Sequence, residues 1–193
     1  MRLFVGIAIA DSVVRELKSA TARLRSSDGS ASDTLRWTAP DSWHITLQFL
    51  GNATPAQLTC LTAQLATVHS MPVPVELGAF GCFDRAGIFI ADVMATPALT
   101  ALSQRVVAAT ARCGFVAEAR PFHPHITLAR AKGQGRGAGI RRLADEMRNR
   151  PPFSHFTARE FLLYESHLSA RGPRYEVLNR FPLSSPGTRA LTS

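Results

Sequence analysis

Residues 44–47 read His-Ile-Thr-Leu, and the same four residues recur at 125–128. On a β-strand, residues two apart face the same side, so His44 and Thr46 are predicted to point together toward one face. The isoleucine and leucine of the tetrad point to the opposite face. Each tetrad therefore offers one imidazole and one hydroxyl to a cleft, while its apolar pair is anchored in a core.

The repetition of the whole tetrad carries more weight than the pattern His-x-Ser/Thr-x. That shorter pattern also occurs at 155–158 and 167–170, so four of the six histidines satisfy it. A histidine met singly on a strand is more often a structural residue with a hydrogen-bonded ring. We therefore expect a functional role for the repeated pair and structural roles for the other four: His69, His123 (which shapes the approach to the second tetrad), His155 and His167.

Apolar runs, turn residues and prolines divide the chain into strands and helices. Strands are expected at 3–10, 44–50, 75–83, 88–94, 125–130, 156–166 and 174–182. Helices are expected at 12–26 with Asp11 as N-cap, at 55–70 with Thr54 as N-cap, at 97–113, and from about 140 to 148. The order shows no regular strand–helix alternation and no G-x-G-x-x-G or Walker loop. It predicts an α+β fold with helices packed on mainly antiparallel sheets.

The two tetrads lie one in each half of the chain, each preceded by a helix and a proline-bearing loop. This placement predicts a two-lobed, pseudo-symmetric molecule. We expect residues 1–183 to form a single bilobal domain and residues 184–193 to form a loose tail. Residues 131–139 contain four glycines and are predicted to be a mobile loop.

Composition favours a globular protein with an anionic partner. The chain has 193 residues, is 46% hydrophobic, and carries a formal net charge of +8. A basic balance of this size favours nucleic acid, a nucleotide or an acidic surface. Because Lys18 and Lys132 are the only lysines, the arginine bias is equally compatible with genome composition. The basic segment 131–148 is best interpreted as a solvated helix face.

The cysteines do not predict a disulfide framework or a zinc site. Cys60, Cys82 and Cys113 are odd in number and far apart, and no C-x-x-C occurs. A reducing cytoplasm is the compartment that this usage favours. Residues 2–10 resemble a short signal peptide, but the apolar run is too short and ends at Asp11, so we expect a buried strand. No apolar stretch approaches the length of a membrane span, and we expect no membrane association.

Two facing histidines suit the cleavage of a phosphodiester. The reaction needs a base to deprotonate water and an acid to protonate the leaving oxygen, and histidine can do either near neutral pH. In-line displacement places the nucleophile and the leaving group on opposite sides of phosphorus. The hydroxyls of Thr46 and Thr127 can donate to the non-bridging oxygens, where charge develops. Since a cyclic phosphate is strained, neither a metal nor another cofactor is expected.

Four stretches carry a resemblance to a known family: RLFVGIAI at 2–9, HITLQFLG at 44–51, RPFHPHITLAR at 120–130, and FLLYESHLSARGPRYEVL at 161–178. The two tetrads resemble the signature of the 2H phosphoesterase superfamily. Within it, the chain is most similar to bacterial RNA 2',3'-cyclic phosphodiesterases, also described as 2'-5' RNA ligase-like proteins. RPFHPHITLAR is the most specific stretch, and together the four span almost the whole chain.

The resemblance implies a bilobal α+β fold with the active cleft between the lobes. It implies that His44 is the proton donor and His125 the acceptor, which together would yield a 2'-phosphate. Thr46, Thr127 and the basic residue Arg130 would together hold the phosphate. On a regular strand Arg130 would face away from His125, five residues before it. Either a bulge or strand end turns it inward, or it binds RNA nearby, or it pairs on the surface.

Three functions remain open from the sequence. The first is metal-independent hydrolysis of an RNA or nucleoside 2',3'-cyclic phosphate. The second is the reverse reaction, in which the same residues join RNA ends through a 2'-5' linkage. The third is a non-catalytic module that grips RNA phosphate, although arginine and lysine serve mere binding better than paired histidines. We expect a monomer.

Overall fold

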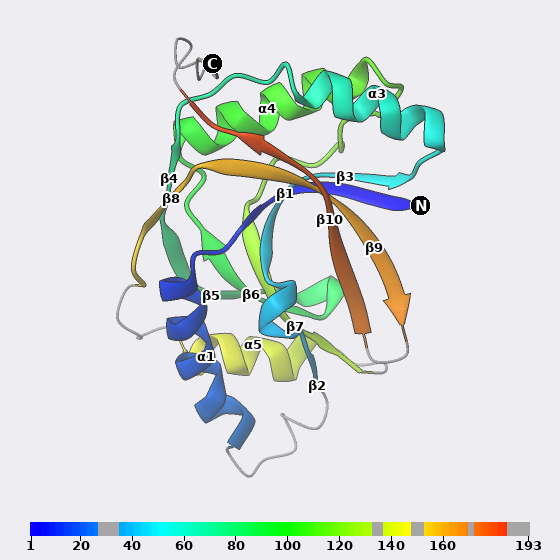
Figure 1. Ribbon diagram of the computed structural model, residues 1–193. Coiled ribbons are helices and arrows are strands. Elements are labelled where there is room, and N and C mark those ends of the chain that lie inside the picture. Colours follow the sequence, from blue (N-terminus) through cyan, green and yellow to red (C-terminus); the bar gives the residue numbers. More distant parts are fainter. Residues whose placement is uncertain (27–34, 133–136, 148–152, 170–171, 185–193) are drawn as a thin grey trace.

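The computed structural model describes residues 1–26, 35–132, 137–147, 153–169 and 172–184. The helices are α1 (Asp11–Ser26), α3 (Pro55–Leu65), α4 (Pro97–Ala111) and α5 (Gly137–Glu146), with short 3-10 helices η1 (Pro40–Ser42) and η2 (Asp84–Ala86). The strands, seen in Figure 1, are β1 (Arg2–Ala8), β2 (Leu35–Trp37), β3 (His44–Asn52), β4 (Val73–Val75), β5 (Leu77–Phe83), β6 (Ile88–Val93), β7 (His125–Ala131), β8 (Phe156–Ala158), β9 (Glu160–Ser169) and β10 (Gly172–Pro182).

The predicted helix starts are largely confirmed. Thr54 caps α3 and forms a capping box with Gln57, because each side chain bonds the backbone amide of the other residue. At α1 the amide of Val14 donates to Ala10, so Ala10 occupies the capping position and the predicted cap Asp11 lies just inside. There its carboxylate is still favourable to the helix dipole. The helix predicted at 55–70 ends at Leu65, in a turn with hydrogen bonds between residues three apart.

An antiparallel sheet of eight strands forms the body of the fold. Its order is β10-β9-β1-β3-β7-β6-β5, with β2 added to β7. Strands β3 and β7 pair through a single residue pair, Ile45 with Ile126. The sheet therefore consists of two four-stranded halves joined at one point, and the two tetrads begin the two strands that meet there. This arrangement confirms the predicted α+β class with antiparallel strands.

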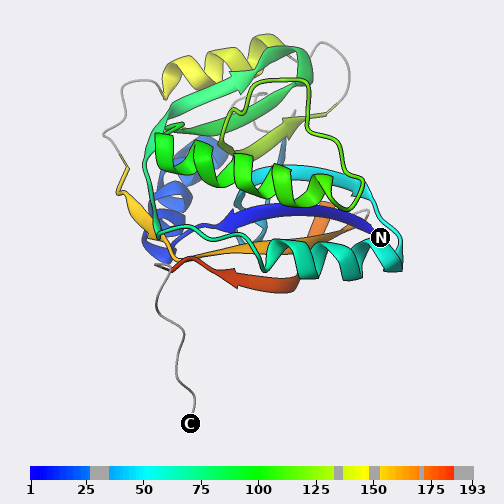
Figure 2. The same cartoon turned by 90° about the horizontal axis from the view of Figure 1, so that it is seen from above.

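Helices cover the two halves separately. Helix α4 packs against α3 and β3, and α5 packs against β5 and β6. Figure 1 and Figure 2 show α3 and α4 side by side on the first half, with α5 on the opposite side of the molecule. The apolar members of both tetrads are buried in one core cluster, which extends from Leu3 to Leu183. The tetrads are thus anchored as predicted.

A disulfide joins Cys60 on α3 to Cys113 just after α4, with 5.8 Å between their Cα atoms. The expectation that no disulfide forms is therefore wrong. The two cysteines are 53 residues apart in the sequence but adjacent in space, because α3 and α4 pack together. Cys82 is the free cysteine. The inference of a reducing compartment from cysteine usage loses its basis.

Three other sequence predictions concern the ends and loops. Within the described ranges, no helix is long and apolar enough to span a membrane. The predicted mobile loop at 131–139 falls partly outside the described residues, because 133–136 are not among them. Residues 185–193 also lie outside, so the division into a domain at 1–183 and a tail at 184–193 stays a prediction.

Candidate active site

The single bridge between β3 and β7 brings the tetrads together. With Ile45 opposite Ile126, the antiparallel register sets His44 opposite Thr127 and Thr46 opposite His125. The two histidines are then diagonal neighbours, which in antiparallel pairs are about 7–8 Å apart. Both histidines therefore lie on one face of the sheet at the junction. The arrangement has approximate twofold symmetry about the Ile45–Ile126 pair.

Both imidazoles are oriented by the same local hydrogen bond. His44 Nδ1 lies 2.8 Å from the carbonyl oxygen of Ser42, and His125 Nδ1 lies 2.8 Å from the carbonyl oxygen of His123. A carbonyl can only accept, so each Nδ1 carries a hydrogen and donates. In the neutral ring, Nε2 is then the free acceptor. Each histidine can therefore exchange a proton through Nε2.

The same irregularity occurs at the fourth residue of each tetrad. In the pairing of β1 with β3, Val5 is opposite Gln48 and Gly6 is opposite Thr46, so Leu47 is an extra residue. Leu128 is an extra residue in the same way in the pairing of β6 with β7. A bulge places two successive residues on the same face. The residue after each bulge returns to the histidine face, which places Phe49 in the first half and Arg130 in the second half there.

Arg130 therefore lies on the same face of the sheet as the two histidines, brought there by the bulge, which is one of the three alternatives that the sequence leaves open. Its side chain is exposed. Burial lowers the pKa of His44 and of His125, and the charge of Arg130 adds to this effect, whereas at Tyr175 the same charge opposes the burial that raises the pKa. The side chain of Arg130 makes no hydrogen bond or ion pair with the described part of the chain. A guanidinium so placed is available to an anionic ligand.

His44 is surrounded by aromatic rings. Its ring centroid is 4.6 Å from that of Phe4, and Tyr175 approaches it edge-on at 4.9 Å. Phe4 stacks on Tyr164 at 4.8 Å. Burial lowers the pKa of His44 from 6.5 to about 4, and the charges of His125 and Arg130 act in the same direction. Burial also raises the pKa of Tyr164 to about 12. His44 is thus neutral at pH 7 in the unliganded protein.

A glycine makes room for the His44 ring. Gly6 on β1 pairs with Thr46, and a Cβ at position 6 would lie 2.8 Å from the carbonyl oxygen of Ile45 and 3.6 Å from Cδ2 of His44. Because the nearest atom belongs to the backbone of β3, it cannot move aside as the end of a flexible side chain can. Gly6 therefore contributes to the site through its lack of a side chain, which leaves space for the His44 ring.

His125 has a more polar environment. Phe83 approaches its ring edge-on at 4.9 Å, and Asp92 is its partner across the β6–β7 pairing. Burial lowers the pKa of His125, and the charges of the His123 ring and of Arg130 act in the same direction, whereas the hydrogen bond to the His123 carbonyl and the carboxylate of Asp92 oppose the shift. The two histidines are held alike, but a negative charge lies beside His125.

Comparison with known proteins identifies the superfamily of the chain. The sequence model of the 2'-5' RNA ligase superfamily matches residues 11–169. The chain belongs to this superfamily. The predicted family is thereby confirmed, on a match that includes both tetrads.

Relatives in the superfamily match most of the chain. An RNA 2',3'-cyclic phosphodiesterase of Geobacillus stearothermophilus is 35% identical over 182 residues, which cover 91% of this chain and 56% of the relative. The chain thus spans little more than half the length of that protein. An RNA 2',3'-cyclic phosphodiesterase of Bacillus subtilis (strain 168) is 32% identical, over 77% of this chain and 81% of the relative.

A solved structure agrees with the fold. The crystal structure of E. coli LigT complexed with NADP+ superposes with a TM-score of 0.73 at 26% sequence identity. The match covers 95% of this chain and 98% of that one. The shared topology supports the pairing of strands that brings the two tetrads together here.

All five residues that the sequence assigned to the site lie around the β3–β7 junction: His44, Thr46, His125, Thr127 and Arg130. Neither threonine hydroxyl makes a hydrogen bond within the described residues, so both are available to a ligand. His167 instead contacts Glu176 on β10 at 3.3 Å, in keeping with its predicted structural role. His155 is exposed just before β8.

Sequence reasoning missed several neighbours of this superfamily member's histidines: Phe4, Phe83, Asp92 and Tyr175. They are brought to the site by the strand order, which no local pattern specifies. The described residues contain no group of three or more histidine, cysteine or acidic side chains that could hold a metal ion.

Proposed function

We propose that the protein hydrolyses the 2',3'-cyclic phosphate of RNA or of a nucleoside to a 2'-phosphate, with His44 and His125 as its acid–base pair and without a metal ion. The observation that carries the proposal is the pair of tetrads across the β3–β7 junction, each with its histidine Nδ1 bonded to a carbonyl at 2.8 Å. This leaves two Nε2 atoms to act on opposite sides of one phosphorus. The names of the two relatives agree with this reaction.

In the proposed reaction, His125 Nε2 takes a proton from water as the water oxygen bonds to phosphorus. The bond from phosphorus to the 3'-oxygen breaks, and His44 Nε2 gives its proton to that oxygen. The product carries the phosphate on the 2'-oxygen. The electrostatics support this division of roles, because Asp92 lies beside His125 and stabilises the imidazolium that forms there.

His44 must carry a second proton to act as the acid. Burial keeps its pKa at about 4 in the unliganded protein. A bound phosphate brings a negative charge next to the ring, which favours the imidazolium and raises the pKa. We therefore expect substrate binding and protonation of His44 to be coupled. Thr46, Thr127 and Arg130 would hold the non-bridging oxygens, where charge increases in the transition state.

Ligation is the second candidate, which the name of the superfamily favours. Here the 5'-hydroxyl of a second RNA end takes the place of water. His125 removes its proton as its oxygen bonds to phosphorus, the bond from phosphorus to the 3'-oxygen breaks, and His44 protonates the 3'-oxygen, which leaves a 2'-5' linkage. Water is in large excess over RNA ends, so hydrolysis is expected to dominate. The protein is expected to act as a monomer, because a single chain supplies both tetrads.

The test is hydrolysis of a nucleoside 2',3'-cyclic phosphate in EDTA, with the 2'- and 3'-phosphate products resolved. Wild type is compared with His44→Ala and His125→Ala, and with His167→Ala as a matched control on another strand pair. We expect the 2'-phosphate, a loss of about 10²-fold or more in each tetrad variant, and no loss in the control. An inactive wild type, or tetrad variants that retain its rate, would favour the phosphate-binding module.

A further inference from the structure

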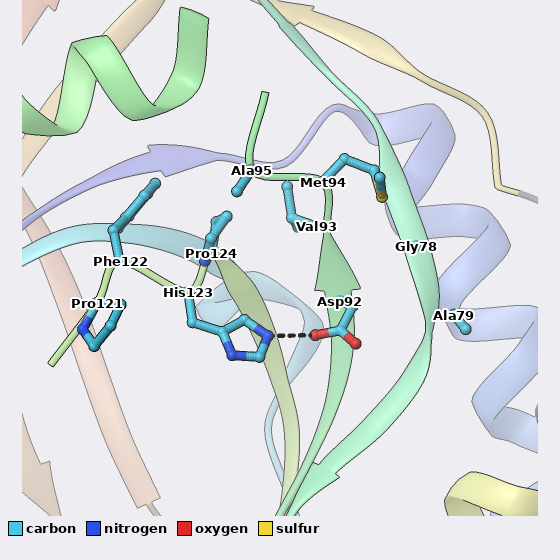
Figure 3. A pocket seen from close by; sticks show the side chains of 10 residues that line it. All are labelled: Gly78, Ala79, Asp92, Val93, Met94, Ala95, Pro121, Phe122, His123 and Pro124. Carbon is cyan, nitrogen blue, oxygen red and sulfur yellow. Dashed lines mark hydrogen bonds and ion pairs between the residues drawn. The ribbon is translucent and has the colours of Figure 1, made fainter. Parts of the chain in front are cut away.

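A second histidine lies beside His125 and is held by a carboxylate. His123, in the loop before β7, donates from Nε2 to Oδ1 of Asp92 at 2.8 Å. Figure 3 shows the imidazole pointing from this loop toward Asp92 on β6, at the edge of a hollow of about 450 Å³. Asp92 is also the cross-strand partner of His125. One carboxylate therefore adjoins both histidines.

The position of Asp92 depends on two glycines of β5. A Cβ at Gly81 would lie 3.1 Å from Oδ2 of Asp92, and a Cβ at Gly78 would lie 3.3 Å from its Cβ. These contacts are tighter than ordinary packing, so Asp92 would have to shift by a few tenths of an ångström to admit a Cβ at either position. The neighbouring strand leaves just enough space for the side chain in the orientation that His123 requires.

His123 is connected to His125 in two ways. Its backbone carbonyl accepts the Nδ1–H of His125 at 2.8 Å, and both rings contact the ring of Phe83 edge-on, with centroids 5.1 and 4.9 Å away. The side chain that Asp92 holds and the carbonyl that orients His125 thus belong to the same residue. Loss of the contact between the His123 side chain and Asp92 is therefore expected to move the carbonyl that orients His125.

We propose that Asp92 and His123 form a positioning pair for His125. The pair fixes the carbonyl of His123, and through it the Nδ1–H tautomer and the direction of the His125 ring. Asp92 also provides a negative charge for the imidazolium that forms when His125 removes a proton from water. This inference rests on the proposed function of His125 as the base, and adds two residues that do not touch the substrate.

Charged and titratable groups face His125 from each neighbouring element. Asp92 comes from β6, His123 from the loop, Arg130 from β7 and His44 from β3. Asp92 is the negative one of these four. Its removal should therefore lower the pKa of His125 further and move the acid limb of the rate profile to lower pH. The amide in Asp92→Asn can still accept from His123, so this variant separates charge from position.

The test uses four variants of the full chain: Asp92→Ala, Asp92→Asn, His123→Ala and His123→Gln. We expect both alanine variants to lose about 10- to 100-fold in kcat with little change in KM. Losses of this size are seen in metalloenzymes when a metal-bound histidine loses the residue that orients it. His123→Gln, which can still donate to Asp92, should recover most of the rate. Asp92→Asn should retain most of kcat at its optimum, with the acid limb moved to lower pH. His167→Ala removes a comparable histidine–carboxylate contact elsewhere and should act as wild type.

A second measurement does not depend on turnover. Nitrogen-15 NMR of the His125 imidazole in the unliganded protein reports its tautomer and its titration directly. We expect a single Nδ1–H tautomer in wild type, a mixture in the two alanine variants, and a lower pKa in Asp92→Asn. An unchanged His125 tautomer and titration in all four variants would overturn the pair. An inactive wild type would instead refute the proposed reaction, and the NMR result would still decide the positioning.

Discussion

The two halves of the site use the same backbone in different electrostatic surroundings. Strands β3 and β7 share a tetrad, a hydrogen bond from Nδ1 to the carbonyl two residues back, and a bulge at the fourth residue of the tetrad. Across from His44 lies Ala8, whereas across from His125 lies Asp92. The symmetric backbone therefore gives both histidines the same orientation. The residues on the neighbouring strands give them different electrostatic surroundings.

The largest expected effect tests whether the halves act as one unit. His44→Ala and His125→Ala should each lose about 10²- to 10⁴-fold in kcat/KM. The double variant should be little worse than the more damaged single variant, because groups that act in one step are not additive. Rates of cyclic phosphate hydrolysis measure this. Losses that multiply in the double variant would mean that each half works independently.

The next effect concerns the residues that follow the two bulges. Arg130→Gln should lower kcat/KM by about 10- to 100-fold, because it removes charge-assisted hydrogen bonds to the phosphate. Phe49→Leu, at the equivalent position of the first half, should change it by less than about threefold. Equal losses in the two variants would contradict the assignment of the phosphate to the arginine side of the site.

Gly6→Ala should disturb one half selectively. The added Cβ would lie 2.8 Å from the Ile45 carbonyl oxygen, so β1 and β3 must shift. We expect a loss of about 1–3 kcal/mol in the free energy of unfolding, as for overpacked sites. The NMR signals of His44 should move and those of His125 should not. Urea unfolding and a histidine-selective spectrum measure the two effects, and wild-type stability would show that the strands adapt.

The smallest effect is the pH dependence of stability. Burial lowers the pKa of His44 to about 4 in the folded protein, so the unfolded chain binds the extra proton between pH 4 and 6.5. The contribution of His44 is fully present above pH 6.5 and is lost as the pH falls toward 4. We expect the free energy of unfolding to fall by about 1–2 kcal/mol between pH 7 and pH 5 because of His44. His44→Gln should reduce this fall in urea unfolding, and an unchanged slope would indicate that the ring is solvated.

The parts of the site that depend on a single strand could be predicted from the sequence. The period of two along His44–Leu47 is sufficient to assign the histidine and threonine to one face and the apolar residues to the core. The side that Arg130 faces could not be assigned, because the bulge at Leu128 arises in the pairing with β6. Asp92 was missed for the same reason, since only the strand order sets it beside His125. The Cys60–Cys113 bridge depends on how two helices pack.

That bridge also has a topological consequence. Cys60 lies on α3 and Cys113 just after α4. These two helices cover the first half of the sheet, while the chain between the cysteines runs through β5 and β6 of the second half. The oxidised protein therefore contains a covalent ring that passes through both halves. Strands β5 and β6, together with Asp92, therefore lie on the covalent ring. An unfolded chain that keeps the ring also has fewer conformations, which favours refolding by about 2–4 kcal/mol.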